Sequence, residues 1–190
     1  LVLGIQGYIT LNQFGITYVT GGMVAIVMTR ELGPILTALM VTARSGSSMA
    51  AEISSMKVGE QLDALRAMSV SPYDYVICPR VIATVIVMPI LSSISIIVSL
   101  ISSYILVVQV FGTSEYMYLQ YTELLLFFSD YIKSILKSCI FGFALSIISC
   151  YKGFYAVTDA SGVGSSTTSA VLWSSVTILV LDALLTLVLF

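Results

Sequence analysis

The sequence contains no histidine, and this absence excludes His-based metal sites, Ser-His-Asp triads and Cys-His dyads. Its three cysteines, Cys78, Cys139 and Cys150, show no C-x-x-C spacing, so we expect neither a disulfide framework nor a zinc site. No basic tract suited to nucleic acid is present, and the net charge is only −2. We find no nucleophile paired with a base and no carboxylate cluster. We therefore expect no catalytic site, no metal and no cofactor.

Charged residues are also scarce. They make up 9% of the chain, against 58% hydrophobic residues, whereas soluble domains usually carry about 25% charged residues. So few charges cannot cover the surface of a soluble globule of 190 residues. The composition therefore predicts an integral, polytopic membrane protein whose outer surface is solvated by lipid.

The apolar runs predict an all-α membrane protein with about five spans. The first run, Leu1–Leu11, covers only about 16 Å as a helix, against roughly 30 Å of hydrocarbon. Because the sequence starts inside this run without Met, we expect it to be the second half of a span. The other four expected spans are Gly22–Ala51, Val81–Val110, Tyr131–Tyr151 and Thr167–Phe190.

Two connections between the spans have distinct compositions. Phe111–Tyr131 is rich in tyrosine, which suits an interfacial segment. Lys152–Ser166 is polar and rich in glycine, so we expect a loop in which a hydroxyl of Ser165, Ser166 or Thr167 caps the fifth span. The run GVGSST within this region lacks the Walker lysine and follows no strand, so we do not interpret it as a phosphate loop.

The segment Arg30–Arg80 contains ten of the eighteen charged residues and separates two apolar regions. Near its start, Arg30-Glu31 precedes Gly33-Pro34, and a proline removes a backbone donor and should kink or restart the helix. Interrupted helices beside ionisable residues are found at membrane transport sites. The alternative is that Arg30 and Glu31 only anchor the helix at the membrane edge. Asp182, alone in the fifth span, is either a site residue or a satisfied acid.

The same segment also contains a stretch of small residues and an amphipathic stretch. The stretch Ala43–Ala51 is crowded with small residues, which let helices approach closely in a bilayer, so we expect it to pack on protein. Lys57–Val70 is amphipathic and, at fourteen residues, too short to span. Its apolar stripe is Val58, Leu62, Leu65 and Met68, and its polar side offers the pairs Lys57–Glu60 and Asp63–Arg66.

The distribution of lysine and arginine predicts the orientation of the chain. With alternating spans, the cluster of Arg44, Lys57, Arg66 and Arg80 falls on the same side as the loop that carries Lys152, and the positive-inside rule makes that side cytoplasmic. Lys133 and Lys137 lie one turn apart and are expected to snorkel to the opposite surface. They are therefore weak evidence for the reverse orientation.

Several motifs carry a family resemblance. They are ELGP, ARSGS followed by AEI, MKVGEQLDAL, SPYDYV and PRV within residues 30–81, GIQGY at residues 4–8, and YKGFYA with SGVGSSTTSAV near the fifth span. This pattern resembles the permease subunits of Mla/Mce-type lipid ABC transporters, the MlaE/YrbE family. It covers nearly the whole chain, is weakest over residues 108–130, and makes residues 1–190 a single permease domain. The family's N-terminal interfacial helix and the start of its first span have no counterpart here.

The resemblance implies the permease subunit of an ABC transporter that moves phospholipid or a related lipid between membranes. It implies a homodimer with a second permease copy, separate ABC ATPase subunits that hydrolyse ATP, and an Mce-domain substrate-binding protein on the other side. It also implies residence in a bacterial inner membrane or, by descent, a plastid inner envelope. The chain itself would not be an enzyme.

The resemblance also implies two sets of functional residues. The short helix Val58–Val70 would be the cytoplasmic coupling helix, whose apolar stripe faces an ATPase. An arginine among the lipid-holding residues has a physical reason, because guanidinium pairs well with phosphate oxygens. The ATPase-coupling set is Val58, Glu60, Gln61, Leu62, Asp63, Leu65, Arg66 and Met68, and the lipid-binding set is Ile5, Tyr8, Arg30, Glu31 and Leu32.

Two other functions remain possible from the sequence. One is a gradient-driven membrane carrier that uses Arg30, Glu31 and Asp182 as ion-coupled sites. The other is a structural membrane anchor with no transport role.

Overall fold

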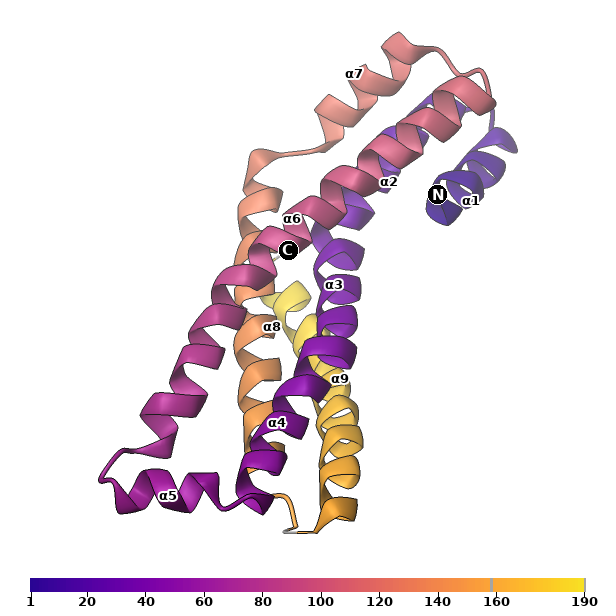
Figure 1. Cartoon of the computed structure of the whole chain (residues 1–190). Helices are drawn as coiled ribbons and strands as arrows, with labels where there is room; N and C mark the ends of the chain where they lie inside the picture. The colour runs from indigo at the N-terminus through magenta and orange to yellow at the C-terminus, as the bar shows by residue number, and fades with distance from the viewer. Residues whose placement is uncertain (158, 190) are drawn as a thin grey trace. The chain divides into compact units, whose positions relative to one another are not determined.

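The computed structural model describes residues 1–157 and 159–189, and every regular element in these ranges is helical (Figure 1). Four of these helical segments are long and apolar enough to cross a membrane: Thr17–Val58, Tyr73–Val110, Phe128–Phe154 and Ser161–Leu189. They match the second to fifth expected spans, although Phe190 lies outside the described residues. The first expected span is represented by α1 (Val2–Asn12), which has 11 residues. The prediction of an all-α polytopic membrane protein is confirmed.

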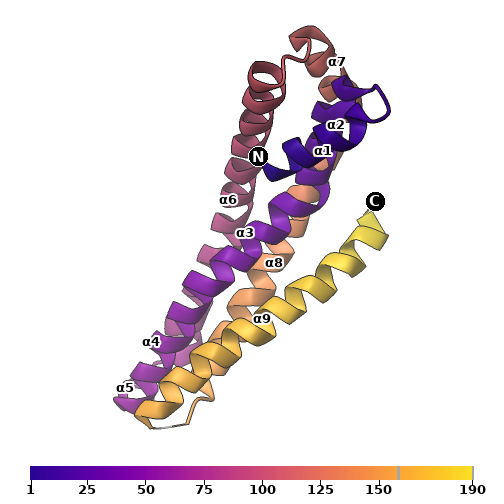
Figure 2. The ribbon, with the colours of Figure 1, turned by 90° about the vertical axis from the view of Figure 1, so that its right-hand side faces the viewer.

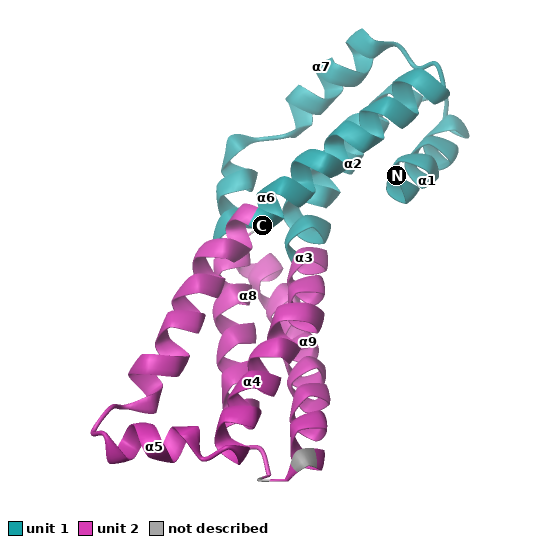
Figure 3. Cartoon of the chain, in the orientation of Figure 1, with its two compact units in different colours: residues 1–34, 91–136 teal, residues 35–90, 137–190 magenta. Residues whose placement is uncertain are grey.

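The chain folds into two compact units, which Figure 3 shows in different colours. The first unit is made of residues 1–34 and 91–136, and the second of residues 35–90 and 137–190. The first contains α1, η1 (Thr17–Val19), α2 (Thr20–Val27), η2 (Met28–Leu32), the end of α6 (Cys78–Tyr104), η5 (Ile105–Val110), α7 (Glu115–Leu125) and the start of α8 (Phe128–Phe154). The second contains α3 (Gly33–Val41) from Ile35 onward, η3 (Thr42–Gly46), α4 (Ser47–Val58), α5 (Gln61–Ala67), η4 (Tyr73–Ile77), the other parts of α6 and α8, and α9 (Ala160–Leu189).

The first unit is held together by close packing of α2 on α7. Gly21 makes this possible, because a Cβ there would lie 2.7 Å from the ring of Tyr118. Tyr118 is buried and donates a hydrogen bond to Ser103 at 3.2 Å. Burial also raises the pKa of Tyr118, which keeps the hydroxyl protonated as a donor. The tyrosine-rich segment therefore contributes to the core as well as to the surface, where Tyr116 is exposed.

The second expected span is not a regular α-helix. The segment Met28–Leu32, just before Gly33-Pro34, is a π-helix, and a second π-helix covers Thr42–Gly46. Pro34 has no N–H to donate to the preceding turn, so a local change in hydrogen bonding is its expected consequence. The predicted interruption at Pro34 is confirmed.

The second unit is built around α4 and α9, which run side by side in Figures 1 and 2. Gly46 and Ala50 are buried on the packed face, whereas Ala43, Ser45 and Ser48 are exposed. Only part of the small-residue stretch thus packs within the chain. The apolar core of the unit consists of Ala38, Met49, Met88, Phe141, Leu145 and Ile178.

The predicted bounds of the loop, Lys152–Ser166, are wrong. Helix α8 continues to Phe154 and α9 begins at Ala160, while Thr158 lies outside the described residues. Ser165, Ser166 and Thr167 therefore lie inside α9, where each hydroxyl donates to a carbonyl three residues earlier, and they do not cap its start. The helix forms despite its glycines because small residues let α9 pack on α4, and packing overrides weak propensity. One such contact joins the hydroxyls of Ser54 and Ser166 at 2.6 Å.

Gly153, near the end of α8, and Gly164, in α9, offer a matched test of the close packing of α8 on α4. A Cβ at Gly153 would lie 2.8 Å from the carbonyl oxygen of Ala50, whereas a Cβ at Gly164 would meet nothing within 4 Å. We expect Gly153→Val to destabilise the protein by about 1–3 kcal/mol through overpacking. Gly164→Val should leave stability nearly unchanged. Thermal unfolding of both variants in detergent makes the comparison, and equal effects would contradict this packing.

Candidate functional site

Arg30 and Asp130 form an ion pair within the first unit. Arg30 lies in the π-helix η2, and Asp130 lies in the first turn of α8. Nε and Nη2 of Arg30 both donate to Oδ2 of Asp130, at 3.1 and 2.8 Å. The side chain of Asp130 is 6% exposed and that of Arg30 is 34% exposed. The carboxylate is thus enclosed, while the guanidinium keeps access to the surface.

An apolar hollow of about 330 Å³ lies in the same unit. Several of its lining residues are direct or near neighbours of the ion pair in sequence: Thr29 precedes Arg30, and Phe128 and Tyr131 flank Asp130. Tyr131 is held by a hydrogen bond from its hydroxyl to Oγ of Ser93 at 2.8 Å. The remaining lining is apolar and comes from Ile96, Ile97, Leu100, Leu126 and Phe127. The unit therefore holds a guanidinium with access to the surface and an apolar hollow lined by its sequence neighbours, which are the two kinds of contact that an amphiphile needs.

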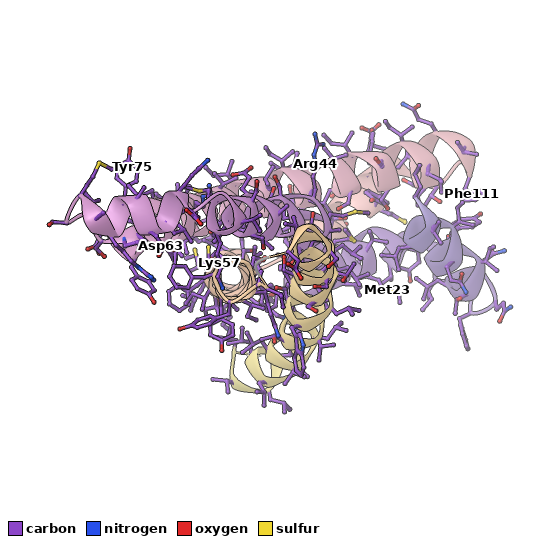
Figure 4. All side chains as sticks on the ribbon, turned by 60° about the horizontal axis from the view of Figure 1, so that its bottom comes forward. Met23, Arg44, Lys57, Asp63, Tyr75 and Phe111 are labelled. Carbon is purple, nitrogen blue, oxygen red and sulfur yellow. The ribbon has the colours of Figure 1, made fainter. Side chains whose placement is uncertain are left out.

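The other residues predicted to bind lipid come from two elements. Glu31 and Leu32 are partly buried in the same π-helix as Arg30. Tyr8 and Ile5 belong to α1, where the ring of Tyr8 stacks on Phe111 with centroids 4.1 Å apart and Ile5 is 38% exposed. The hollow between α1 and α2 is lined by other side chains: Leu3, Gln6, Gly7, Thr10, Met23, Val24 and Val27. Met23 and Phe111 are labelled in Figure 4.

The predicted amphipathic helix is shorter than expected. It covers Gln61–Ala67, seven residues, rather than Lys57–Val70. Val58 is the last residue of α4, and Glu60 adopts a left-handed conformation with φ +55°. The physical reason is Gly59, a poor helix former at which α4 can end. As a result Lys57 does not pair with Glu60 but donates to the carbonyl of Ala156 at 2.7 Å.

The middle of the predicted apolar stripe packs in the chain's own core. Leu62 is 4% exposed and packs in a cluster that includes Ile53 and Phe154, with Leu65 partly buried against it. A short amphipathic helix gains most by burying its stripe in the nearest core. Val58 and Met68, the two ends of the predicted stripe, are exposed at 39% and 66%.

The polar side of α5 is the part open to a partner. The predicted pair Asp63–Arg66 is confirmed, with Nη1 of Arg66 3.0 Å from Oδ1 of Asp63. The guanidinium of Arg66 also lies 5.7 Å from the ring centroid of Phe154. A hollow of about 260 Å³ is lined by Lys57, Leu62, Asp63, Arg66, Phe154 and Tyr155. Lys57 and Asp63 are labelled in Figure 4.

A second ion pair lies inside the second unit. Nζ of Lys137 is 2.7 Å from Oδ1 of Asp182 and donates to Oγ1 of Thr186 at 2.9 Å. The side chain of Lys137 is fully buried and that of Asp182 is 17% exposed. The expectation that Lys137 snorkels to a surface is therefore wrong, because a counter-ion and a hydroxyl on α9 satisfy it inside the protein. Asp182 is a satisfied acid, as one of the two sequence interpretations had it.

Membrane-length helices that carry ion pairs define an integral membrane protein. The family model described as Permease MlaE matches residues 1–188. The chain therefore belongs to this family and is an ABC transporter permease. The match confirms the family resemblance predicted from the sequence motifs.

Three relatives illustrate the family's range. A probable ABC transporter permease protein of Rickettsia typhi is 42% identical over 193 residues, which cover 100% of this chain and 73% of the relative. A probable ABC transporter permease protein of Synechocystis is 36% identical over 190 residues, 100% of this chain and 72% of the relative. The chloroplastic protein trigalactosyldiacylglycerol 1 of Arabidopsis thaliana is 38% identical over 174 residues, 92% of this chain and 50% of the relative.

Proposed function

We propose that this permease moves phospholipid or a related lipid and that Arg30 contacts the lipid headgroup. The observation that carries the proposal is the Arg30–Asp130 pair, with its partly exposed guanidinium, in the unit that holds an apolar hollow. The family supports it, and the Arabidopsis relative bears the name of a galactolipid. Guanidinium recognises phosphate through a planar fork of donors, and the hollow suits an acyl chain.

In this proposal Asp130 positions Arg30. Two donors of the guanidinium meet one carboxylate oxygen, which fixes the plane of the fork. The exposed part of Arg30 is then pre-organised for an anionic headgroup, so little conformational entropy is lost on binding. The other residues of the lipid-binding set, Ile5, Tyr8, Glu31 and Leu32, would contact the lipid around this headgroup.

We further propose that α5 couples this chain to a separate ABC ATPase subunit, which hydrolyses the ATP. The stripe residues Leu62 and Leu65 would act as the anchor that transmits movement into α4 and α8, because they pack on Ile53, Cys150 and Phe154. The residues that would contact the ATPase are those left exposed: Val58, Glu60, Gln61, Asp63, Arg66 and Met68. A second permease copy and an Mce-domain protein would complete the assembly in a bacterial inner membrane or a plastid inner envelope.

Mass spectrometry of the gently purified, tagged full-length protein tests the proposed function. We expect phospholipid, an ABC ATPase and an Mce-domain protein to co-purify with it. Lipid retention no higher than that of an unrelated membrane protein of similar size would contradict the lipid substrate. Absence of the ATPase would contradict the assembly.

Asp63→Arg tests the coupling role of α5. The change places two arginines one turn apart on the exposed side, so we expect the amount of co-purified ATPase to fall about tenfold or more through like-charge repulsion at the interface. The exposed Asp63–Arg66 pair contributes less than about 1 kcal/mol, so the fold should persist. Glu123→Arg, at an exposed position on α7, is the matched control and should retain the ATPase. Full retention by both variants would contradict the coupling role.

A further inference from the structure

A groove of about 340 Å³ lies on the second unit. Its lining comes from the last turns of α8 and from the middle of α9, and it is mostly apolar. The six lining residues are Ile147, Ile148, Tyr151, Lys152, Trp173 and Thr177. None of them belongs to the sites described above.

Lys152 is the only charged residue of this groove. It is partly buried in the last turn of α8, and its ammonium lies 5.3 Å from the centroid of the Trp173 ring. Among the described residues it has no hydrogen bond and no ion pair. An ammonium in apolar surroundings is costly unless an anion or water reaches it, and the cation–π contact offsets only part of that cost.

Two aromatic side chains line the groove together with Lys152. Trp173 is 58% exposed and Tyr151 is 56% exposed, so both rings present large faces outside the core of the unit. Tryptophan and tyrosine are enriched at the level of lipid headgroups, and lysines near helix ends direct their charge to the same level. Lys152 lies two residues before the end of a membrane-length helix, which fits that depth.

We propose that this groove binds an anionic glycerophospholipid of the surrounding leaflet. The phosphate lies against the ammonium of Lys152, the rings of Trp173 and Tyr151 sit beside the glycerol region, and an acyl chain follows Ile147 and Ile148. The distribution of lysine and arginine assigns this end of α8 to the cytoplasmic side, where the leaflet is rich in anionic lipid. The lipid is a bound component of the permease, its site shares no residue with the Arg30 set, and its binding does not depend on whether Arg30 contacts a transported lipid.

Trp173 makes the site directly observable, because it is the only tryptophan of the sequence. We would place the full-length protein in lipid nanodiscs and measure quenching of its fluorescence by dibrominated phosphatidylglycerol and by dibrominated phosphatidylcholine. A Trp173→Phe variant supplies the background to subtract. One lysine near an anionic headgroup predicts an approximately fivefold preference for phosphatidylglycerol at equal, low mole fraction.

Charge variants decide the outcome. Lys152→Gln should abolish the preference while phosphatidylcholine still quenches, which shows that the groove remains folded, and Lys152→Arg should keep the preference. Arg44→Gln removes an exposed cation elsewhere on the same unit and should have no effect. Equal quenching by both lipids, or a preference that survives Lys152→Gln, would overturn the proposal. Absence of quenching by either lipid would overturn it too, because the groove would then be covered by protein such as a second copy.

Discussion

We expect Arg30→Ala to reduce lipid transport by about tenfold to a hundredfold, while the protein still inserts and folds. The size follows from the loss of a charge-assisted contact to phosphate, worth about 1.5–3 kcal/mol. The measurement is the transfer of labelled phospholipid from proteoliposomes that contain the permease and its ATPase. Arg30→Lys keeps the charge but loses the planar fork of donors. Its transport rate should therefore fall between those of the unaltered permease and the Arg30→Ala variant.

A charge swap separates this role from a structural one. The double variant Arg30→Asp with Asp130→Arg keeps an ion pair between the same two positions, so its melting temperature should recover relative to Arg30→Ala. The guanidinium would then emerge from α8 instead of η2, and transport should stay low. Recovery of transport together with stability would show that the pair serves only the fold and would contradict the proposed role of Arg30.

Lys137→Met is expected to lower the free energy of unfolding by about 3–5 kcal/mol. Lys137 is fully buried and pairs with Asp182 at 2.7 Å, so its removal leaves a carboxylate without its counter-ion inside the protein. Thr186 also loses the donor to its hydroxyl. The measurement is thermal unfolding of the purified protein in detergent.

The matched control removes both charges. In Lys137→Met with Asp182→Leu the two positions are apolar and of similar volume, and buried pairs replaced in this way are often tolerated or stabilising. We expect the double variant to recover most of the stability lost in Lys137→Met. If the single variant unfolds at the same temperature as the unaltered protein, the pair does not carry the stabilisation assigned to it.

The fold class could be predicted from the sequence because it depends on composition and on the length of apolar runs. So few charges leave lipid as the only solvent for most of the surface, and backbone satisfaction in lipid then requires helices. The boundaries were less predictable. Glycine and serine in residues 160–166 indicate a loop locally, but contacts with α4, such as that between Ser166 and Ser54, keep this stretch helical. Tertiary packing is not visible in a local window.

The candidate site was predictable only in part. Arg30 could be singled out because it is a charge in an apolar run beside Gly33-Pro34. Its partner Asp130 was missed because it lies 100 residues away and no local pattern joins the two. The sequence offered one signal, namely that Asp130 is an acid at the start of an apolar span.

Lys137 and α5 show the same limit. A lysine inside a span suggests snorkelling unless the acid on another helix is known, and here that acid is Asp182. The periodicity of Leu62 and Leu65 correctly identified one face of a helix, but periodicity does not tell whether that face meets the chain's own core or a partner. Leu62 is buried in the cluster with Phe154, so this part of the face meets the chain's own core.

The central claim is that this chain passes lipid at the expense of ATP hydrolysed by a partner. Its most direct test is the transfer of labelled phospholipid by the permease reconstituted with its ATPase, with and without ATP, and with ion gradients collapsed. We expect transfer that requires ATP, persists without ion gradients and is lost in the Asp63→Arg variant. Transfer that proceeds without ATP and stops when an ion gradient is collapsed would contradict it and identify a gradient-driven carrier instead.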